Sequence, residues 1–278
     1  MPAFCYFNGT IMPVADAKVG IYDIGLLRGF GIYEALRTFG RKPFHLADHL
    51  KRFHVSAEGL GLHIPASDEE IAHTIDELIA KNIPEGREAL ARFILTGGPA
   101  RAGIEHDQNV QQTFYILVEP LDPIPADVLT RGCSLIVFEH QRPFPATKTT
   151  NYIQAVLLQD ERKGAGALEI LYTSQGKVLE CATSNFFIIK NGTIVTAKKN
   201  ILEGITRNVT IDVAKKEFPV EERDISVDEL YEADEAFLTS SFKDVVPVVD
   251  VGGKKIGEGV PGTITRRVMA LFAAAAQS

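Results

Sequence analysis

The sequence contains no tryptophan, only three methionines and only three cysteines in 278 residues. The cysteines, Cys5, Cys133 and Cys181, are odd in number and widely spaced, which argues against a disulfide framework and against a zinc knuckle. No apolar run is long enough to span a membrane, and the N-terminus lacks the basic and apolar regions of a signal peptide. These absences predict a cytoplasmic protein in a reducing compartment.

An excess of basic residues is also missing. Lysine and arginine together number 29, against 36 aspartates and glutamates, which gives a formal net charge of −7. Such a chain has no electrostatic footprint for nucleic acid or for an anionic membrane surface. The composition is otherwise that of an ordinary globular protein, with 45% hydrophobic and 23% charged residues, so we expect a small-molecule partner.

The length suits two domains better than one core, and a proline-rich stretch indicates the boundary. Three prolines fall within residues 119–126, and we take this stretch as the interdomain linker. We therefore predict a small N-terminal α+β domain over residues 1–118 and a larger C-terminal α+β domain over residues 127–278.

Local patterns predict the elements of the first part. Asn8-Gly9 between two short apolar runs is typical of a β-hairpin. An apolar stripe predicts a helix over residues 46–60, and a capping box from Ser67 to Glu70 begins a second helix. The glycines of residues 25–31 permit close or unusual backbone paths. Strands are expected over residues 32–39, 91–95 and 113–118.

The second part alternates strands and helices. Strands are expected over residues 135–138, 169–173, 178–181 and 186–189, with a further strand after the turn at Asn191-Gly192. Helices are expected over residues 151–162, 205–218 and 262–276.

The stretch from residue 143 to residue 152 holds the first candidate catalytic residue. Two prolines stiffen the approach, and an apolar-periodic segment starts after Asn151, so Lys148 is predicted on a turn that leads into a helix. An amine on a short connection can be aimed into a cleft, as a Schiff-base lysine must be. The alternative is a solvated surface lysine, and this stretch alone does not decide between the two.

Three later pieces could act with such a lysine. Gly204 precedes an amphipathic helix that begins with Ile205 and Thr206, and the free N–H groups of a helix N-terminus can bind phosphate. The alternative there is a structural junction capped by Thr206. Glu180, at a strand end, could hold a proton on a ring nitrogen or only face solvent. The hydroxyls of residues 239–241 could donate to an anion or only cap a loop.

In this order, the pieces resemble the class IV (fold-type IV) pyridoxal-phosphate aminotransferases. That family includes branched-chain amino acid aminotransferases, D-amino acid transaminases and aminodeoxychorismate lyases. The resemblance extends from the Asn8-Gly9 hairpin to about Thr265 and depends on Gly29–Glu34, His49–Arg52, Lys148–Asn151, Glu180, Ser184–Phe186, Gly204–Arg207, Thr239–Ser241 and Val246–Val248. It implies the two-domain α+β fold of D-amino acid aminotransferases, with pyridoxal 5'-phosphate bound by the larger domain.

The resemblance also assigns roles to single residues. Lys148 is implied to form the Schiff base with the cofactor and to shuttle the proton at the substrate Cα. Glu180 would keep the pyridine nitrogen protonated, so that the ring can act as an electron sink. The other implied cofactor contacts are Arg52, the backbone amides of Ile205 and Thr206, the Thr206 hydroxyl and Ser241 for the phosphate, and Tyr152 for the phenolic oxygen.

Departures from the branched-chain pattern favour a D-amino acid substrate. The spacing from Lys148 to Asn151 is one residue shorter than in branched-chain enzymes and matches the D-amino acid transaminases and the lyases. Arg28 resembles the arginine of an atypical D-amino acid transaminase group, which shares the Lys-Thr-x-Asn-Tyr and Thr-Ser-x-x-Lys patterns. Tyr33–Arg37, in contrast, resembles the Phe-Glu-Gly-Ile-Arg of branched-chain enzymes. The implied substrate contacts are Arg28, Tyr33, Arg101, Thr183 and Ser240.

The predicted function is a transaminase that works by ping-pong half-reactions between an amino acid, such as D-glutamate or D-alanine, and a 2-oxo acid. An L-branched-chain amino acid aminotransferase is the alternative, and an aminodeoxychorismate lyase is third. The resemblance further implies a homodimer. His45 and His49 have no evident third ligand, and Gly29-x-Gly31 lacks the third glycine of a dinucleotide fingerprint, so neither a metal nor a nicotinamide cofactor is expected.

Overall fold

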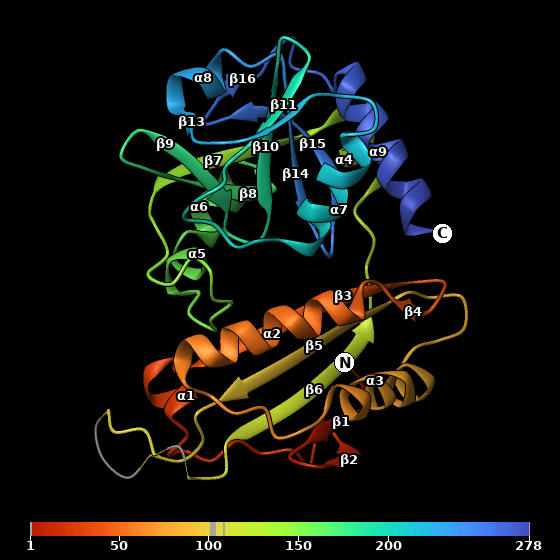
Figure 1. Cartoon of the computed structure of the whole chain (residues 1–278), viewed down its shortest axis with the longest axis vertical. Coiled ribbons are helices and arrows are strands. Elements are labelled where there is room, and N and C mark those ends of the chain that lie inside the picture. Colours follow the sequence, from red (N-terminus) through yellow and green to blue (C-terminus); the bar gives the residue numbers. More distant parts are fainter. Residues whose placement is uncertain (1, 101–103, 108, 278) are drawn as a thin grey trace. The chain divides into compact units, whose positions relative to one another are not determined.

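The computed structural model describes residues 2–100, 104–107 and 109–277, which divide into two compact units (Figure 1). The first unit comprises Met1–Asp122 and Thr147–Tyr152, and the second comprises Pro123–Ala146 and Ile153–Ser278. The chain therefore returns to the first unit for a short stretch that contains Lys148. Helices and strands occur in both units, so the expected α+β class is confirmed.

The first unit contains an antiparallel sheet with the strand order β2-β1-β6-β5-β3-β4. Its strands are β1 (Phe4–Phe7), β2 (Thr10–Pro13), β3 (Gly31–Phe39), β4 (Lys42–Pro43), β5 (Ala89–Thr96) and β6 (Thr113–Pro120). The predicted hairpin is confirmed, because Asn8 and Gly9 join β1 to β2 with φ angles of 44° and 97°. A tight two-residue hairpin turn requires positive φ angles, which asparagine and glycine adopt most readily.

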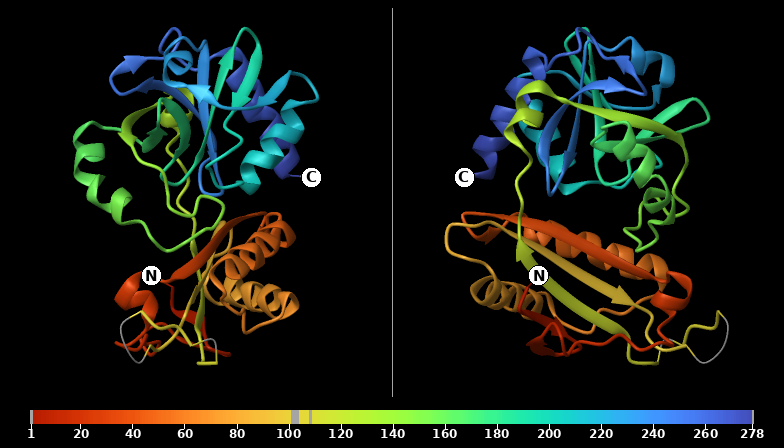
Figure 2. Two further views of the ribbon diagram at one scale, coloured as in Figure 1. Left: turned by 60° about the vertical axis from the view of Figure 1, so that its left-hand side comes forward. Right: turned by 180° about the vertical axis from the view of Figure 1, so that it is seen from behind.

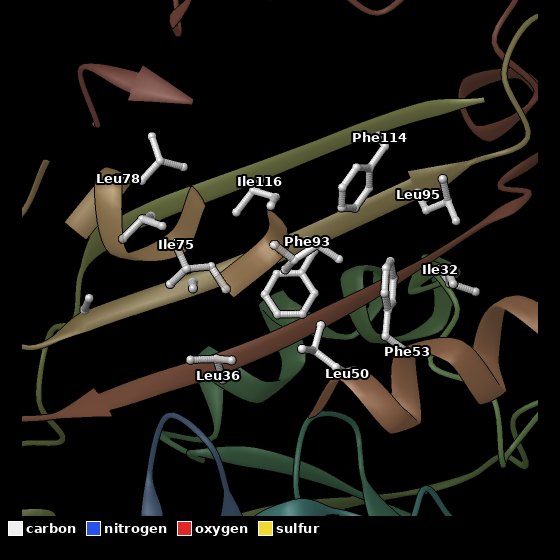
Figure 3. Packing of buried hydrophobic residues seen from close by; sticks show 14 of the residues in the cluster. Ile32, Leu36, Leu50, Phe53, Ile75, Leu78, Phe93, Leu95, Phe114 and Ile116 are labelled. Carbon is white, nitrogen blue, oxygen red and sulfur yellow. The ribbon is translucent and has the colours of Figure 1, made fainter. Parts of the chain in front are cut away.

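Two helices, α2 (Leu46–Leu60) and α3 (Asp68–Asn82), cover the same face of this sheet (Figure 2). Their apolar stripes close a core with the strands, in which Phe53 of α2 lies edge-on to Phe93 of β5 with ring centroids 5.6 Å apart (Figure 3). The predicted capping box is confirmed, because the side chains of Ser67 and Glu70 each bond the other's backbone N–H.

A short helix, α1 (Ile24–Arg28), forms where the glycines permit unusual backbone paths. The buried Asp23 carboxylate caps its start and also accepts hydrogen bonds from the hydroxyls of Thr96 and Thr113, at 2.8 and 2.6 Å. Gly29 ends the helix in the left-handed region, with φ 67°. The prediction missed α1 because a five-residue helix shows too little periodicity, whereas its cap ties it firmly to strands β5 and β6.

The second unit contains a mixed sheet with the strand order β12-β11-β10-β14-β15-β7-β8-β9-β13, and β16 pairs with β15. Its strands are β7 (Cys133–Glu139), β8 (Glu169–Ser174), β9 (Lys177–Cys181), β10 (Asn185–Lys190), β11 (Thr193–Thr196), β12 (Val220–Glu222), β13 (Ile225–Ser226), β14 (Glu235–Ser240), β15 (Asp244–Val251) and β16 (Lys254–Lys255). Strand β7 runs parallel to both of its neighbours, β8 and β15.

The helices of the second unit are α4 (Ala126–Arg131), α5 (Ile153–Leu157), α6 (Gln159–Gly164), α7 (Ile205–Ala214), α8 (Val227–Tyr231) and α9 (Thr263–Ala276). Helices α7 and α9 pack against each other (Figure 1). Helix α7 also packs against β14, and α9 packs against β14 and β15. No helix among the described residues is long and apolar enough to cross a membrane.

The prediction of one helix over residues 151–162 was wrong, because α5 and α6 are separate helices. The amide of Gln159 donates to the Ala155 carbonyl at 2.8 Å. In a continuous helix that carbonyl would accept from the backbone N–H of residue 159. The side chain therefore competes for a helical hydrogen bond at the point where the helix breaks.

Candidate functional site

Lys148 lies on a stretch whose backbone is bonded to strand β3 and helix α2 of the first unit. The N–H of Tyr33 donates to the Lys148 carbonyl at 2.9 Å. Two residues later, the N–H of Thr150 donates to the Gly31 carbonyl at 2.9 Å. The N–H of Lys148 itself donates to the hydroxyl of Ser56 at 3.2 Å. Bonds to fixed elements thus hold the backbone of Lys148, unlike that of a lysine on a free surface loop.

The Lys148 side chain lies against Tyr33, which in turn contacts Tyr152. The Lys148 Nζ lies 4.4 Å from the centroid of the Tyr33 ring. The hydroxyls of Tyr33 and Tyr152 are 2.6 Å apart, and the two rings meet edge to face. A cation over an aromatic face is attracted by the ring quadrupole, so the Tyr33 ring helps to hold the Lys148 side chain at that position. The first unit thereby brings together three of the residues predicted for catalysis, cofactor binding and substrate binding.

Arg52 is held in place by a fully buried carboxylate. Its Nε and Nη2 donate to the two oxygens of Glu34 at 2.9 and 2.7 Å, and the Nδ1 of His49 lies 3.1 Å from Glu34 Oε1. Burial alone would raise the pKa of Glu34, but Arg52 and His49 together hold it well below its ordinary value. Burial lowers the pKa of His49. The prediction identified Arg52 but missed the role of Glu34, whose side-chain partners Arg52 and His49 lie on α2.

The predicted substrate cations of the first unit are less enclosed. Arg28, the last residue of α1, is exposed, and its Nη1 donates to the Leu27 carbonyl at 2.8 Å. Arg101 lies outside the described residues. Arg92 pairs with Glu119 across neighbouring strands, although neither side chain is fully buried.

Glu180, at the end of β9, is buried within the second unit and does not face solvent. The Nε and Nη2 of Arg142 both lie within hydrogen-bond distance of Glu180 Oε1, at 2.9 and 2.8 Å. The N–H of Leu202 donates to Oε2 at 3.0 Å, and the amide of Asn185 approaches the same oxygen at 3.5 Å. Charged and neutral donors therefore compensate the burial of this carboxylate. The prediction missed Arg142, because no sequence pattern joins it to a residue 38 positions away.

The N-terminus of α7 and the end of β14 supply polar groups suited to an anion. Gly204 precedes Ile205 and Thr206, whose N–H groups belong to the first turn and have no earlier turn to bond. The alternative that Thr206 caps the helix is wrong, because Gly204 is the N-cap. On β14, which packs against α7, the hydroxyls of Thr239 and Ser240 are buried without a hydrogen-bond partner among the described residues. Ser241 follows directly.

Thr183 belongs to a second buried carboxylate cluster in this unit. The hydroxyls of Thr183 and Ser184 donate to Glu169 Oε1, and the Nζ of Lys243 lies 2.9 Å from the same oxygen. Lys243 also donates to the Thr183 hydroxyl at 2.8 Å. Burial alone would raise the pKa of Glu169, but Lys243 and the two hydroxyls hold it below its ordinary value. The cluster fixes the turn between β9 and β10, and the prediction did not include Glu169.

No group of three or more metal-ligating side chains is found among the described residues. His45 Nδ1 lies 2.8 Å from the Asp48 carboxylate, whereas His49 contacts Glu34. These two histidines therefore face different partners.

The comparison with known families identifies the chain. The model of amino-transferase class IV matches residues 31–251, and the chain therefore belongs to this family, as the sequence predicted. A Methanocaldococcus jannaschii protein, provisionally assigned as a branched-chain-amino-acid aminotransferase, is 33% identical over 96% of this chain and 94% of its own length. A D-alanine aminotransferase of Listeria monocytogenes is 32% identical over 95% of this chain and 93% of its own length.

Solved structures show the same fold. The branched-chain amino acid aminotransferase of Escherichia coli aligns with a TM-score of 0.91 and 27% identity over 99% of this chain and 94% of its own. Another branched-chain amino acid aminotransferase, crystallised with pyridoxamine 5'-phosphate, aligns with a TM-score of 0.90 and 27% identity over the same shares of the two chains. The predicted fold-type IV aminotransferase fold is therefore confirmed.

The residues described above fit a phosphorylated pyridine cofactor. An anion at the N-terminus of α7 would accept from the first-turn N–H groups. The end of β14, which packs against this helix, holds the hydroxyls of Thr239 and Ser240, which are buried without a partner among the described residues. Glu180 is a buried carboxylate, which is the kind of acceptor that a protonated ring nitrogen needs. In the first unit, the Lys148 side chain carries a primary amine of the kind that such a cofactor would need.

Replacing Glu34 with glutamine should destabilise the protein, because Arg52 would keep its buried charge without a countercharge. We expect the free energy of unfolding at neutral pH to fall by about 3–5 kcal/mol in Glu34→Gln, as for other broken buried ion pairs. Urea unfolding measures this change. The matched control is Glu119→Gln, which breaks the half-exposed pair with Arg92 and should cost only about 0–1 kcal/mol.

The pair of Glu34 and Arg52 also makes the free energy of unfolding of the wild-type protein depend on pH. Folding lowers the pKa of Glu34 from its ordinary value of 4.5. The contribution of the ionised Glu34 carboxylate to the free energy of unfolding is therefore complete above pH 4.5 and is lost as the pH falls below 4.5. Glu34→Gln lacks this titration, so the stability difference between the two proteins should shrink in acid. A difference that stays constant from neutral pH to about pH 3 would contradict the assignment.

Proposed function

We propose that the chain is a pyridoxal 5'-phosphate-dependent transaminase that moves an amino group between an amino acid and a 2-oxo acid in two ping-pong half-reactions. The supporting observation is that a class IV aminotransferase chain holds the Lys148 amine over Tyr33 by bonds to β3 and α2. When bound, the cofactor supplies an electron sink for negative charge at the substrate Cα. The protein must then supply an amine, a proton carrier and charged groups that bind the phosphate and the ring nitrogen of the cofactor.

Lys148 provides the amine in this proposal. It would hold the cofactor covalently, and the same amine would carry the proton at the substrate Cα. The hydrogen-bonded hydroxyls of Tyr33 and Tyr152 provide polar contacts beside it, Tyr152 for the phenolic oxygen of the cofactor and Tyr33 for the substrate. The fixed backbone limits the directions in which the amine can reach, which favours proton transfer at a single atom.

The proposed cofactor contacts are those that family membership implies. Arg52, the N–H groups of Ile205 and Thr206, the Thr206 hydroxyl and Ser241 bind the phosphate, and Glu180 keeps the ring nitrogen protonated. A guanidinium and a helix N-terminus are the donors that a phosphate dianion prefers. Arg142 supports this role, because its guanidinium contacts the buried Glu180 carboxylate and compensates its burial.

For the substrate, we propose a D-amino acid such as D-alanine or D-glutamate. The relatives named D-alanine aminotransferase and the short Lys148-to-Asn151 spacing support this proposal. Arg28 or Arg101 binds the α-carboxylate, with Thr183 and Ser240 as further contacts. An L-branched-chain amino acid is the second candidate, and it is supported by the solved branched-chain enzymes that share the fold.

A borohydride experiment tests Lys148. Sodium borohydride reduces a lysine Schiff base to a stable bond, so the wild-type protein loaded with pyridoxal 5'-phosphate should yield a modified peptide that contains Lys148. Lys148→Ala should lose the Schiff-base absorption band and more than about 99% of the turnover, because the covalent step has no other amine. Lys51→Ala removes an exposed lysine of α2 and should change neither. Modification at another lysine would contradict the assignment.

A single-turnover titration distinguishes the substrates. The Schiff-base absorption band of the loaded protein should disappear with D-alanine and D-glutamate, with formation of pyruvate and 2-oxoglutarate, and should persist with L-leucine and L-glutamate. Reaction with the L-amino acids alone would establish the branched-chain alternative instead. Release of pyruvate from aminodeoxychorismate without amino transfer would indicate a lyase.

We also propose that the protein is a homodimer, because an apolar segment of the first unit is exposed. Ile21 and Leu26 are 75% and 67% exposed, and Val19, Tyr22 and Leu27 nearby are also exposed. Such a grouping of large apolar side chains marks a protein interface more often than free surface. A second copy that covers this segment would also enclose Arg28, which ends α1.

The dimer has a direct test in the double variant Ile21→Glu, Leu26→Glu. Two buried charges at an interface without partners should dissociate the dimer, and we expect sedimentation velocity to show a monomer at concentrations where the wild-type protein is dimeric. Val260→Glu places a charge on another exposed apolar residue, in the second unit, and should leave the dimer intact. A monomeric wild-type protein would contradict the proposal.

A further inference from the structure

Asn185 joins two parts of the second unit that the proposed function assigns to opposite ends of the cofactor. One part is Glu180, proposed for the ring nitrogen. The other is the segment from Leu202 to Thr206, proposed for the phosphate. Asn185 is the first residue of β10 and is buried, and its side chain contacts both parts. The following inference rests on the proposed function.

The amide nitrogen of Asn185 closes a small network with Glu180 and Leu202. Nδ2 donates to the Leu202 carbonyl at 2.8 Å and lies 3.5 Å from Glu180 Oε2. The N–H of Leu202 donates to the same carboxylate oxygen at 3.0 Å. Both backbone groups of Leu202 are thus bound, one by the carboxylate and one by the amide. The position of this residue therefore depends on both side chains.

The amide oxygen of Asn185 occupies the space beside Gly204. A Cβ atom built on Gly204 would lie 2.0 Å from Asn185 Oδ1, far closer than two such atoms can approach. The backbone of Gly204, with φ −70° and ψ 136°, is one that any L-residue adopts. Glycine is therefore required here by the presence of Asn185 and not by the backbone conformation.

We propose that Asn185 is a positioning residue that fixes Glu180 relative to the N-terminus of α7. Its amide nitrogen contacts both parts, its amide oxygen fills the space beside Gly204, and its backbone is anchored in the sheet opposite Thr239 of β14. A displacement of Asn185 would release Leu202 and with it the donor to Glu180 Oε2. A change confined to the phosphate segment should consequently weaken the hold on the pyridine ring as well.

The test compares ligands that have and lack the phosphate. Apo wild-type protein, Gly204→Ala, Asn185→Ala and the double variant are titrated with pyridoxal 5'-phosphate, with pyridoxal and with inorganic phosphate. Gly204→Ala displaces Asn185, so it should weaken pyridoxal binding by about tenfold even though pyridoxal has no phosphate. In the Asn185→Ala background the added Cβ meets no amide oxygen, and the same substitution should change pyridoxal binding by less than about twofold.

A second variant separates the two functions of the Asn185 side chain. Asn185→Asp keeps an oxygen beside Gly204 but loses the donor to Leu202, so it should weaken pyridoxal binding and retain the full effect of Gly204→Ala. Asn185→Asp also keeps the proposal testable if Asn185→Ala fails to fold. Weaker phosphate binding in Gly204→Ala with unchanged pyridoxal binding would overturn the proposal, and so would independent, additive effects of the two substitutions.

Two controls distinguish positioning from general stability. Asn82 makes three comparable bonds to the backbone of Phe4 and Val118 in the first unit, so Asn82→Ala should lower the unfolding temperature without changing the pyridoxal affinity. Gly164→Ala adds a Cβ with no described atom within 4 Å beyond its own chain neighbours and helix backbone. If wild-type protein binds neither pyridoxal 5'-phosphate nor pyridoxal, the proposed cofactor is wrong and this inference is overturned with it.

Discussion

The burial of the Glu34 carboxylate is the constraint on which the first unit depends. A carboxylate without solvent is tolerated only where fixed donors surround it, and here the donors come from α2 and from the backbone of Ala35. The pair between Glu34 and Arg52 therefore docks α2 onto β3 in one register. That register places Ser56 where it can receive the N–H of Lys148, while the neighbouring part of β3 bonds the Lys148 carbonyl. Structural support and proposed chemistry thus depend on the same ion pair.

The second unit contains two further buried carboxylates that are surrounded by fixed donors. Glu180 is compensated by Arg142 and Leu202, and Glu169 by Lys243 and two hydroxyls. Both clusters meet at the short turn between β9 and β10, which is held on one side by Glu169 and on the other by the Asn185 amide. Buried polar networks in which every member has a partner hold a single geometry, because any shift leaves a group unsatisfied. A turn that carries candidate contacts to a cofactor and a substrate gains from such rigidity.

The features that the sequence predicted are those determined by neighbouring residues. The Asn8-Gly9 turn, the capping box from Ser67 to Glu70 and the stripe of α2 each depend on spacings of a few positions. The roles of Lys148, Arg52 and Glu180 are implied by family resemblance, and Lys148 and Glu180 were first singled out by their places beside a turn and at a strand end. Their supports could not be predicted, because the pairs of Arg142 with Glu180 and of Lys243 with Glu169 join residues 38 and 74 positions apart. The break between α5 and α6 was missed because the Gln159 side chain competes with a helical backbone hydrogen bond to the Ala155 carbonyl.

The division of the first unit into two sequence segments has a consequence for its synthesis. Most of this unit is complete at Asp122, but the stretch Thr147–Tyr152 joins it only after α4 and β7 of the second unit have been made. On a ribosome, the edge of β3 at Ile32 must therefore wait for its partner Thr149. Lys148 belongs to the last segment of the first unit to be synthesised. The contacts around its amine therefore cannot form on a nascent chain before part of the second unit has been made.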